Sequence, residues 1–352
     1  MRAIGFFEHG GPEVLAALDL PEPSPGPGEV RVAVAACAVN RLDLWVRGGL
    51  PNLRIDLPHV LGSDIAGQID AVGNGMDPAW VGRRVVVNPG LSCGACEACL
   101  SGWDNLCRRY RILGENAPGG YAERIVVPLA NVVPIPEADT RPLVEWAAVP
   151  LVFLTAWQML VVRAKVGPGD VVLVHAVGSG VGSAAVQIAR LFGARVVGLA
   201  STDEKLARAR ARGAEATVRS DDPDWPKKVR ALPFVGKRGV DVVFEHVGRA
   251  TFADSIKLAR RGGVVVTCGA SSGHEATIDL RHVFFRQIQI LGSTMGSKAL
   301  LHRIVPLVAR GALVPEVARV LPLERAADAH RTIDERKTYG KIVLEVGEPA
   351  GP

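Results

Sequence analysis

The chain has 352 residues, of which 48% are hydrophobic and 22% are charged, and its formal net charge at pH 7 is +5. A chain of this length exceeds what one hydrophobic core usually organises, so we expect two domains. Basic residues are scattered and aromatic residues make up only 5% of the chain, which argues against a nucleic-acid partner. We find no apolar run of the roughly 18 residues that span a bilayer, and no signal peptide at the N-terminus, so we expect a cytoplasmic protein without membrane contact.

The first 150 residues have the features of a β-rich region. Residues 29–35 alternate between polar and small or apolar side chains, as in a half-buried strand. Residues 60–72 and 82–87 supply further strand-like segments, and a stretch rich in proline and glycine at 21–28 indicates turns.

From about residue 165 the pattern changes to alternating strands and helices. Residues 171–174 form a short, wholly apolar run, which is typical of a strand covered on both faces. A turn at 178–182, a helix over 181–192, a strand over 195–199 and a helix beginning near Thr202 follow, with Ser201 and Glu204 at the spacing of a capping box. The buried-strand pattern then recurs at residues 241–244, 263–268 and 288–291. The sequence therefore predicts an α/β fold with a doubly wound parallel sheet.

The last segment, residues 298–352, contains two predicted helices and ends in a predicted strand at 341–344. We expect this segment to pack against the first region. One domain then comprises residues 1–150 and 298–352, and the nucleotide-binding domain, residues 151–297, is inserted between its two parts.

Between the first buried strand and its helix lies a glycine turn. It consists of Gly178, Ser179, Gly180, Val181 and Gly182. Such a turn presents free backbone N–H groups at a helix N-terminus, where a pyrophosphate binds. The strict G-x-G-x-x-G spacing is not met, because its third glycine position is Ser183. A tight turn without a ligand is the alternative.

The choice of cofactor depends on the end of the second strand, where an acidic residue would bind the ribose 2′-hydroxyl of NADH. Residues 199–202 contain no acid before Asp203, whereas Ser201 and Lys205 provide donors for a 2′-phosphate. We therefore expect NADPH as the cofactor, with NADH as the alternative. Asp203 and Glu204 are also residues that the first turn of any helix favours.

Four of the six cysteines fall within fifteen residues. Cys93, Cys96, Cys99 and Cys107 follow the pattern C-x2-C-x2-C-x7-C within a lobe at residues 90–110. Four thiolates close the coordination sphere of a tetrahedral ion, so we expect one structural Zn²⁺ per chain and no chemistry at that ion. Reduced free thiols or a redox pair remain the alternatives. Cys37 and Cys268 lie in apolar segments, as buried packing thiols do.

These features together resemble the medium-chain dehydrogenase/reductase superfamily over nearly the whole chain. The matching motifs are residues 10–15, residues 28–30, the cysteine lobe, the glycine turn and the closing Gly-Lys-Ile-Val-Leu at 340–344. The resemblance implies a GroES-like, β-rich catalytic domain and a Rossmann domain.

The resemblance also locates the catalytic zinc ligands of the alcohol dehydrogenases in this superfamily. Their first cysteine corresponds to Asn40, their His-Glu pair to Ser63 and Asp64, and their last ligand to Leu151. Asparagine and leucine do not replace thiolates. The segment 38–43 instead resembles the zinc-free quinone oxidoreductases, which carry an asparagine at this point. A replacement site built from His59, Asp64 and Asp43 is the alternative.

The resemblance further implies roles for single residues. Asn40 is expected to donate its amide to the substrate oxygen, or alternatively to cap a local turn. Asp64 would order the site or be a structural acid paired with an arginine, and Thr155 would lie beside the nicotinamide. Lys341 is a candidate phosphate contact. At the nicotinamide side the resemblance implies Val247, Gly269 and Ala270.

The leading hypothesis is an NADPH-dependent reductase of quinones, enones or other activated carbonyl compounds that works without a catalytic zinc. An alcohol or aldehyde dehydrogenase and a non-catalytic cofactor-binding scaffold are the alternatives. Members of the superfamily pair through the strand that corresponds to residues 289–293, so the resemblance implies a homodimer or homotetramer.

Overall fold

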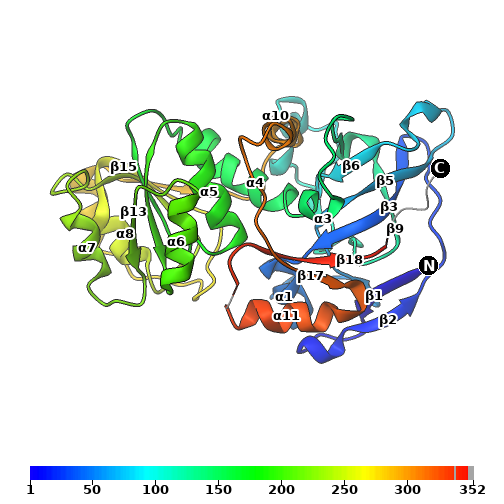
Figure 1. Cartoon of the computed structure of the whole chain (residues 1–352), viewed down its shortest axis with the longest axis horizontal. Helices are drawn as coiled ribbons and strands as arrows, with labels where there is room; N and C mark the ends of the chain where they lie inside the picture. Colours follow the sequence, from blue (N-terminus) through cyan, green and yellow to red (C-terminus); the bar gives the residue numbers. More distant parts are fainter. Residues whose placement is uncertain (337, 348–352) are drawn as a thin grey trace. The chain divides into compact units, whose positions relative to one another are not determined.

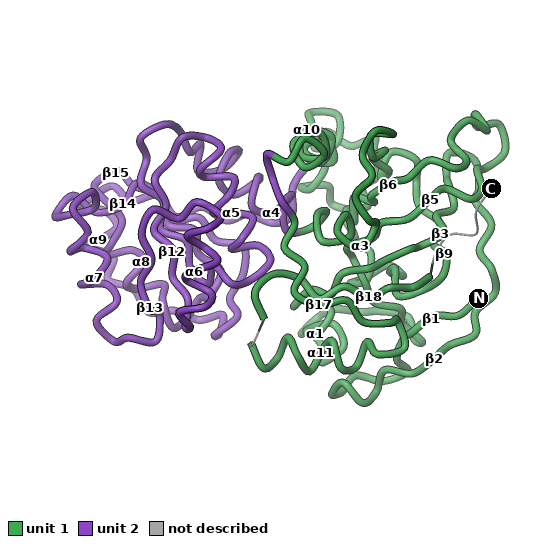
Figure 2. The backbone as a smooth tube through the Cα atoms, in the orientation of Figure 1, with its two compact units in different colours: residues 1–151, 297–311, 315–352 green, residues 152–296, 312–314 purple. Residues whose placement is uncertain are grey.

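The computed structural model describes residues 1–336 and 338–347, and these divide into two compact units. Unit 1 comprises Met1–Leu151, Ser297–Gly311 and Pro315–Pro352, and unit 2 comprises Val152–Gly296 and Ala312–Val314 (Figure 2). The predicted boundaries, 150/151 and 297/298, lie one residue from these. The short segment Ala312–Val314 differs, because the Gln187 side chain of unit 2 bonds the backbone of Val314 through both its amide nitrogen and its oxygen.

Unit 1 is built on a seven-stranded sheet in which β3 (Glu29–Ala38) is the central strand (Figure 1). The strand order is β10-β6-β5-β3-β18-β17, and β9 also pairs with β3. The other strands of this sheet are β5 (Asp64–Val72), β6 (Arg84–Val87), β9 (Arg124–Pro128), β10 (Val132–Pro134), β17 (Val317–Pro322) and β18 (Lys341–Glu345). β18 runs antiparallel to β3, which confirms that the end of the chain packs against the first region.

Smaller elements complete unit 1. A three-stranded sheet has the order β2-β1-β4, and β7 pairs with β8 beside the cysteine lobe. The strands are β1 (Arg2–Phe6), β2 (Ala16–Asp19), β4 (His59–Val60), β7 (Gly90–Leu91) and β8 (Arg111–Ile112). The α-helices are α1 (Arg41–Gly48), α2 (Glu97–Leu100), α3 (Leu143–Trp146), α10 (Lys298–Ala309) and α11 (Ala326–Asp334).

Unit 2 is a six-stranded sheet in which every neighbouring pair of strands is parallel, in the order β13-β12-β11-β14-β15-β16. The strands are β11 (Val171–Val174), β12 (Arg195–Ala200), β13 (Ala216–Arg219), β14 (Val240–Glu245), β15 (Ala259–Thr267) and β16 (Gln289–Gly292). The helices α5 (Gly180–Leu191), α6 (Asp203–Ala211), α7 (Trp225–Ala231), α8 (Phe252–Leu258) and α9 (Leu280–Arg286) connect them. The order reverses direction at β11, which is the doubly wound arrangement that the sequence predicts.

Two local predictions need correction. The N-cap residue of α6 is Thr202 and not Ser201. The Thr202 hydroxyl accepts a hydrogen bond from the Lys205 N–H at 3.3 Å. The strand β13 was not predicted, because its sequence, Ala-Thr-Val-Arg, has no continuous apolar run.

The segment Leu143–Arg163 corrects the expectation that no stretch is long enough to span a bilayer. It contains α3, α4 (Pro150–Trp157) and a π-helical turn (Gln158–Arg163), and it passes the length and composition test for a spanning helix. However, 78% of its most apolar window is buried inside the protein. A largely buried helix of this kind is typical of a protein core, so the segment is weak evidence for a membrane span.

Candidate functional site

The pairing of β3 with two neighbouring strands brings three polar residues together in unit 1. Ala38, at the end of β3, pairs with Asp64 of β5 on one side and with Val343 of β18 on the other. Asn40 follows β3 and precedes α1, and Lys341 is the first residue of β18. The ends of three strands therefore deliver Asn40, Asp64 and Lys341 to one place, which we call the polar cluster.

The polar cluster is buried and closely hydrogen-bonded. The Lys341 ammonium donates to Asn40 Oδ1 and, at 2.8 Å, to Asp64 Oδ2. Asn40 Nδ2 donates to Asp64 Oδ2 at 3.0 Å and to the Ala38 carbonyl at 3.4 Å. Asp64 Oδ1 accepts the backbone N–H of Leu151. Since Lys341 has no acceptor atom, its bond to Asn40 fixes which end of the amide is the oxygen.

This geometry changes the role expected for Asn40. Both N–H groups of its amide have protein acceptors, Asp64 and Ala38, so the amide is not free to donate to a substrate oxygen. The backbone N–H of Asn40 also bonds Asp43 Oδ2 at 2.6 Å, at the start of α1. Asn40 is thus the N-cap residue of α1, and its side chain holds Lys341 and Asp64 in position.

Lys341 also differs from its expected role. Its side chain is only 5% exposed, and its ammonium bonds Asn40 and Asp64 within unit 1, whereas the predicted contact is with a cofactor phosphate. Asp64 is fully buried, and its cationic partner is this lysine and not an arginine.

A second buried network lies beside the polar cluster. Arg47 donates to His330 Nδ1 at 2.8 Å, His330 Nε2 lies 3.2 Å from the Tyr121 hydroxyl, and that hydroxyl donates to Asp43 Oδ2 at 3.4 Å. Burial and the charge of Arg47 lower the pKa of His330 to about 3, so the imidazole is neutral. Burial raises the pKa of Asp43 to about 6. This network fixes Asp43, which in turn holds the backbone of Asn40 and, at 3.1 Å, that of Gly62.

The positions that correspond to catalytic zinc ligands do not form a metal site. The Ser63 hydroxyl donates to the Leu113 carbonyl at 2.7 Å, and Leu151 offers only its backbone to Asp64. Asp64 already carries the Lys341 ammonium. These residues therefore do not fit a zinc ion.

The four cysteines of the lobe do fit one. Within the described residues they form the one group of three or more His, Cys, Asp or Glu side chains with metal-binding spacing, and their sulfur atoms all lie within 4.8 Å of one another. The Cys93–Cys99 and Cys96–Cys99 sulfur distances are 3.9 and 3.5 Å. Four Zn–S bonds of about 2.3 Å at tetrahedral angles need sulfur separations near 3.8 Å. The structure thus brings the predicted ligands together in a geometry compatible with structural zinc.

In unit 2 the glycine turn lies between β11 and α5. Ser179 is the N-cap residue of α5, and its hydroxyl accepts the Gly182 N–H at 3.0 Å. A Cβ atom on Gly182 would lie 2.4 Å from the Ala176 carbonyl oxygen, so only glycine allows this close turn. The first N–H groups of α5, at Gly180 and Val181, have no acceptor within the helix. They are therefore suited to bind an anionic ligand.

The other predicted cofactor residues follow neighbouring strands at the same edge of the sheet. Ser201 is exposed after β12, and the stem of Lys205 lies beside Gly178, where a Cβ atom would be 2.8 Å from Lys205 Cδ. Ser272 joins the loops after β14 and β15, since its N–H and hydroxyl both donate to the Val247 carbonyl. Val247, Gly269 and Ala270 in these loops are all partly exposed.

Thr155, near the end of α4, has a buried hydroxyl group without a partner in the described part of the protein. It is 6% exposed, and its hydroxyl oxygen is buried with no hydrogen-bond partner among the described residues. Buried hydroxyl groups are normally bonded, so an orphaned one fits a site that a bound cofactor completes.

Glu245 is a buried residue of this edge that supports the loop after β14 and that was not predicted from the sequence. Fully buried at the end of β14, it accepts the N–H groups of Val247 and Gly248 at 2.7 and 3.1 Å and the Ser255 hydroxyl at 2.7 Å. Burial opposes its charge, but these hydrogen bonds and His175 outweigh that effect and lower its pKa. The carboxylate therefore fixes the loop that carries Val247. An acidic residue at the end of an apolar strand was the available signal.

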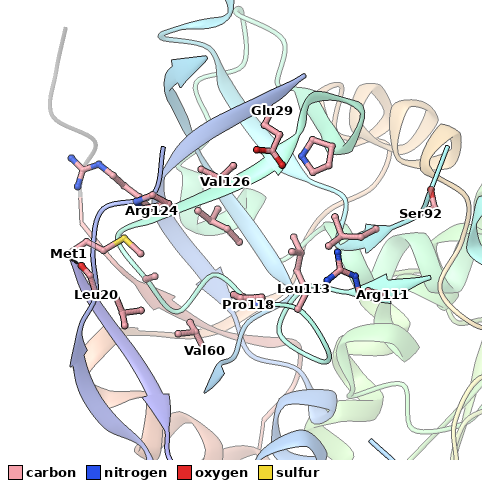
Figure 3. A pocket seen from close by; sticks show the side chains of 17 residues that line it. Met1, Leu20, Glu29, Val60, Ser92, Arg111, Leu113, Pro118, Arg124 and Val126 are labelled. Atoms are coloured by element: carbon pink, nitrogen blue, oxygen red, sulfur yellow. Dashed lines mark hydrogen bonds between the residues drawn. The ribbon is translucent and has the colours of Figure 1, made fainter. Parts of the chain in front are cut away.

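Unit 1 also contains a separate pocket of about 400 Å³ (Figure 3). Apolar side chains such as Leu20, Val60 and Leu113 line it, together with Glu29 and Arg124. Glu29 accepts the Gly26 N–H, and Arg124 bonds Asp70 at 3.0 Å. Arg111 is a third charged residue of the lining. None of the predicted site residues lines this pocket.

The zinc assignment predicts a specific effect of removing one thiolate. Cys107→Ser should bring the zinc content well below one ion per chain and lower the melting temperature by roughly 5–10 °C, since the ion closes the lobe. Metal analysis and thermal unfolding measure both effects. Cys268→Ala, which alters a half-buried thiol outside the lobe, should keep one zinc ion. A full equivalent of zinc in Cys107→Ser would refute the assignment.

Comparisons with known proteins agree with this architecture. Residues 26–137 match the model of the alcohol dehydrogenase GroES-like domain, and residues 180–310 match that of the zinc-binding dehydrogenases. The chain is 30% identical to a quinone oxidoreductase of Homo sapiens over 98% of this chain and 97% of the relative. It is 33% identical to a crotonyl-CoA reductase of Streptomyces avermitilis over 85% and 71%.

Among solved structures, one described as an NAD-dependent alcohol dehydrogenase is 54% identical, with a TM-score of 0.94, and the match covers 99% of this chain and 100% of that one. These relatives are all named as oxidoreductases, and the two matched domain models belong to one superfamily. The chain therefore belongs to the medium-chain dehydrogenase/reductase superfamily and is an NAD(P)-dependent oxidoreductase.

Proposed function

We propose that the protein reduces quinones, enones or other activated carbonyl compounds with NADPH, and that its active site uses the polar cluster in place of a catalytic zinc. The observation that carries this proposal is the hydrogen-bonded set of Asn40, Asp64 and Lys341, in which Asn40 corresponds to the first zinc ligand of the zinc-dependent relatives and Asp64 to the acid beside the second. The names of the human and Streptomyces relatives, a quinone oxidoreductase and a crotonyl-CoA reductase, support this substrate class.

The chemistry also favours conjugated acceptors. An alcohol must lose a proton before it gives up a hydride, and a metal ion normally stabilises the resulting alkoxide by several kcal/mol. A conjugated acceptor spreads the charge that develops on its oxygen, so a hydrogen-bond donor is sufficient. A bound reduced nicotinamide would supply the hydride in this reaction. The protein's own residues supply position and polarity.

The preference for NADPH rests on the end of β12. Ser201 and Thr202 are exposed there, and the first acid, Asp203, is turned toward Arg219, whose Nη1 lies 3.4 Å away. Lys205 lies beside the glycine turn and provides a positive charge for a 2′-phosphate.

The second candidate is an alcohol dehydrogenase that uses NADH. The 54% identical solved structure, described as NAD-dependent, favours it. The residues of this chain favour it less, because Asn40, Ser63 and Leu151 give a metal no adequate ligand set.

An assay of the purified enzyme against three substrate classes separates the two candidates. We expect kcat/KM for the NADPH-dependent reduction of a quinone or a cyclic enone to exceed kcat/KM for the NADP⁺-dependent oxidation of a primary alcohol by at least about 100-fold, because the alkoxide lacks a metal. Lys205→Ala should lower kcat/KM for NADPH about 10-fold and leave that for NADH unchanged. Lys228→Ala, on α7, is the matched control. Faster alcohol oxidation than enone reduction would overturn the proposal.

We also propose that the protein is a homo-oligomer that pairs through β16. This strand forms one edge of the unit 2 sheet, where Ile290 is 40% exposed. The preceding helix α9 exposes Leu280, Phe284 and Phe285 by 59–66%. An uncovered apolar edge strand beside exposed aromatic rings invites pairing with a second copy.

Charge substitutions at this edge test the pairing. The double variant Ile290→Lys/Phe285→Glu should shift the mass measured by light scattering from a dimer or tetramer to a monomer, since it places charges in the apolar contact. Leu191→Lys, at an exposed leucine that ends α5, should leave the mass unchanged. A wild-type protein that is already monomeric at micromolar concentration would contradict the proposal.

A further inference from the structure

The hydrogen bonds of the polar cluster leave one donor uncommitted. An ammonium group has three N–H bonds, and Lys341 has two acceptors among the described residues, Asn40 Oδ1 and Asp64 Oδ2. Asn40, by contrast, uses both N–H groups of its amide within the protein. Lys341 and Asn40 remain 5% and 7% exposed, whereas Asp64 is fully buried.

From this arrangement we infer that Lys341 is the catalytic residue that donates a hydrogen bond and then a proton to the carbonyl oxygen of the substrate. The inference rests on the proposed function and names the group that performs its acid step. Asn40 and Asp64 are then positioning residues. They hold the ammonium from two sides and direct its third N–H away from themselves.

The cluster is built to keep that ammonium fixed. Asp64 is held by the Leu151 N–H on one oxygen and by Asn40 on the other, and Asn40 is held by the Ala38 carbonyl and by the start of α1. Each acceptor of Lys341 thus has its own fixed support. The Asp64 carboxylate also balances the lysine charge, so the buried pair is neutral overall.

A hydride that adds to the electron-poor carbon of an enone or quinone moves an electron pair onto the carbonyl oxygen. The Lys341 N–H bond breaks, its proton goes to that oxygen, and the bonding pair stays on nitrogen as a neutral amine. The amine then takes a proton from water. The net change is the addition of one hydride and one proton to the substrate, with the nicotinamide as the reductant.

Preorganised donors at a developing oxyanion contribute about 10²–10³-fold to kcat. We therefore expect Lys341→Met to lower kcat for a cyclic enone by about 10²–10³-fold, with KM changed by less than about threefold. NADPH affinity, measured by quenching of protein fluorescence, should stay unchanged. If Lys341→Met lowered NADPH affinity as much as it lowered kcat, Lys341 would instead contact a cofactor phosphate, and the inference would be overturned.

A second readout does not depend on turnover. 4-Nitrophenol binds as its coloured phenolate where a cationic donor faces its oxygen, because an opposite charge favours the ionised form. At a pH below the pKa of the free phenol, the wild-type enzyme should induce the phenolate absorption band, and Lys341→Met should not. The band in both proteins, or in neither, would contradict a cationic donor in the site.

Two further variants control for folding. Lys341→Met leaves the buried Asp64 unpaired, so the double variant Lys341→Met/Asp64→Asn removes both charges and should restore the melting temperature without restoring kcat. Lys298→Met breaks another partly buried pair of unit 1, Lys298–Asp104, and should keep kcat within about twofold. If the wild type reduces no quinone or enone, the proposed function fails, and the 4-nitrophenol spectra still decide the role of Lys341.

Discussion

The central constraint in this protein is the double pairing of β3. Its end pairs with β5 through Ala38 and Asp64 and with β18 through Ala38 and Val343, so residues more than 270 positions apart in sequence are placed within hydrogen-bonding distance. A buried carboxylate and a buried ammonium are each costly alone and acceptable as a hydrogen-bonded pair. The pairing register, which the apolar faces of three strands fix, therefore makes the polar cluster possible.

The same dependence explains what could be predicted from the sequence. The parallel sheet, the glycine turn and the cysteine lobe are encoded by local patterns, and the structure contains all three. Asn40 and Asp64 were identified through the resemblance to the superfamily. Lys341 was identified too, but its bonds to Asn40 and Asp64 were not, because no local pattern shows that β18 lies beside β3. The Asn40 amide was expected to donate to a substrate oxygen for the same reason. Its acceptors, Asp64 and Ala38, are brought close to it only when the strands pair.

Smaller errors have simpler physical causes. Thr202 and Ser201 are adjacent and both suited to capping, and only the backbone geometry selects Thr202. The strand β13 is short and half-polar because it lies at the edge of its sheet, so it carries no buried-strand signal. The apolar segment 143–163 is interrupted by polar residues, and its burial in the core explains its composition. Glu245 was missed because its partners are backbone N–H groups and hydroxyls of later loops.

Unit 1 contains two distinct polar sites. The cysteine lobe offers four thiolates to a closed, structural zinc and is joined to the start of α10 by the 3.0 Å contact between Lys298 and Asp104. The polar cluster contains its own cation, the Lys341 ammonium, which bonds Asn40 and Asp64. A lysine supplies one positive charge and a proton that it can transfer. A zinc ion supplies two positive charges and no proton. That difference suits acceptors that need protonation as they are reduced.

The most direct measurement is an anomalous-difference map at the zinc edge from crystals of the enzyme as purified. The account predicts one peak per chain, enclosed by Cys93, Cys96, Cys99 and Cys107, and no peak near Asn40 and Asp64. A second peak at the polar cluster, with the Lys341 side chain displaced from it, would contradict the account.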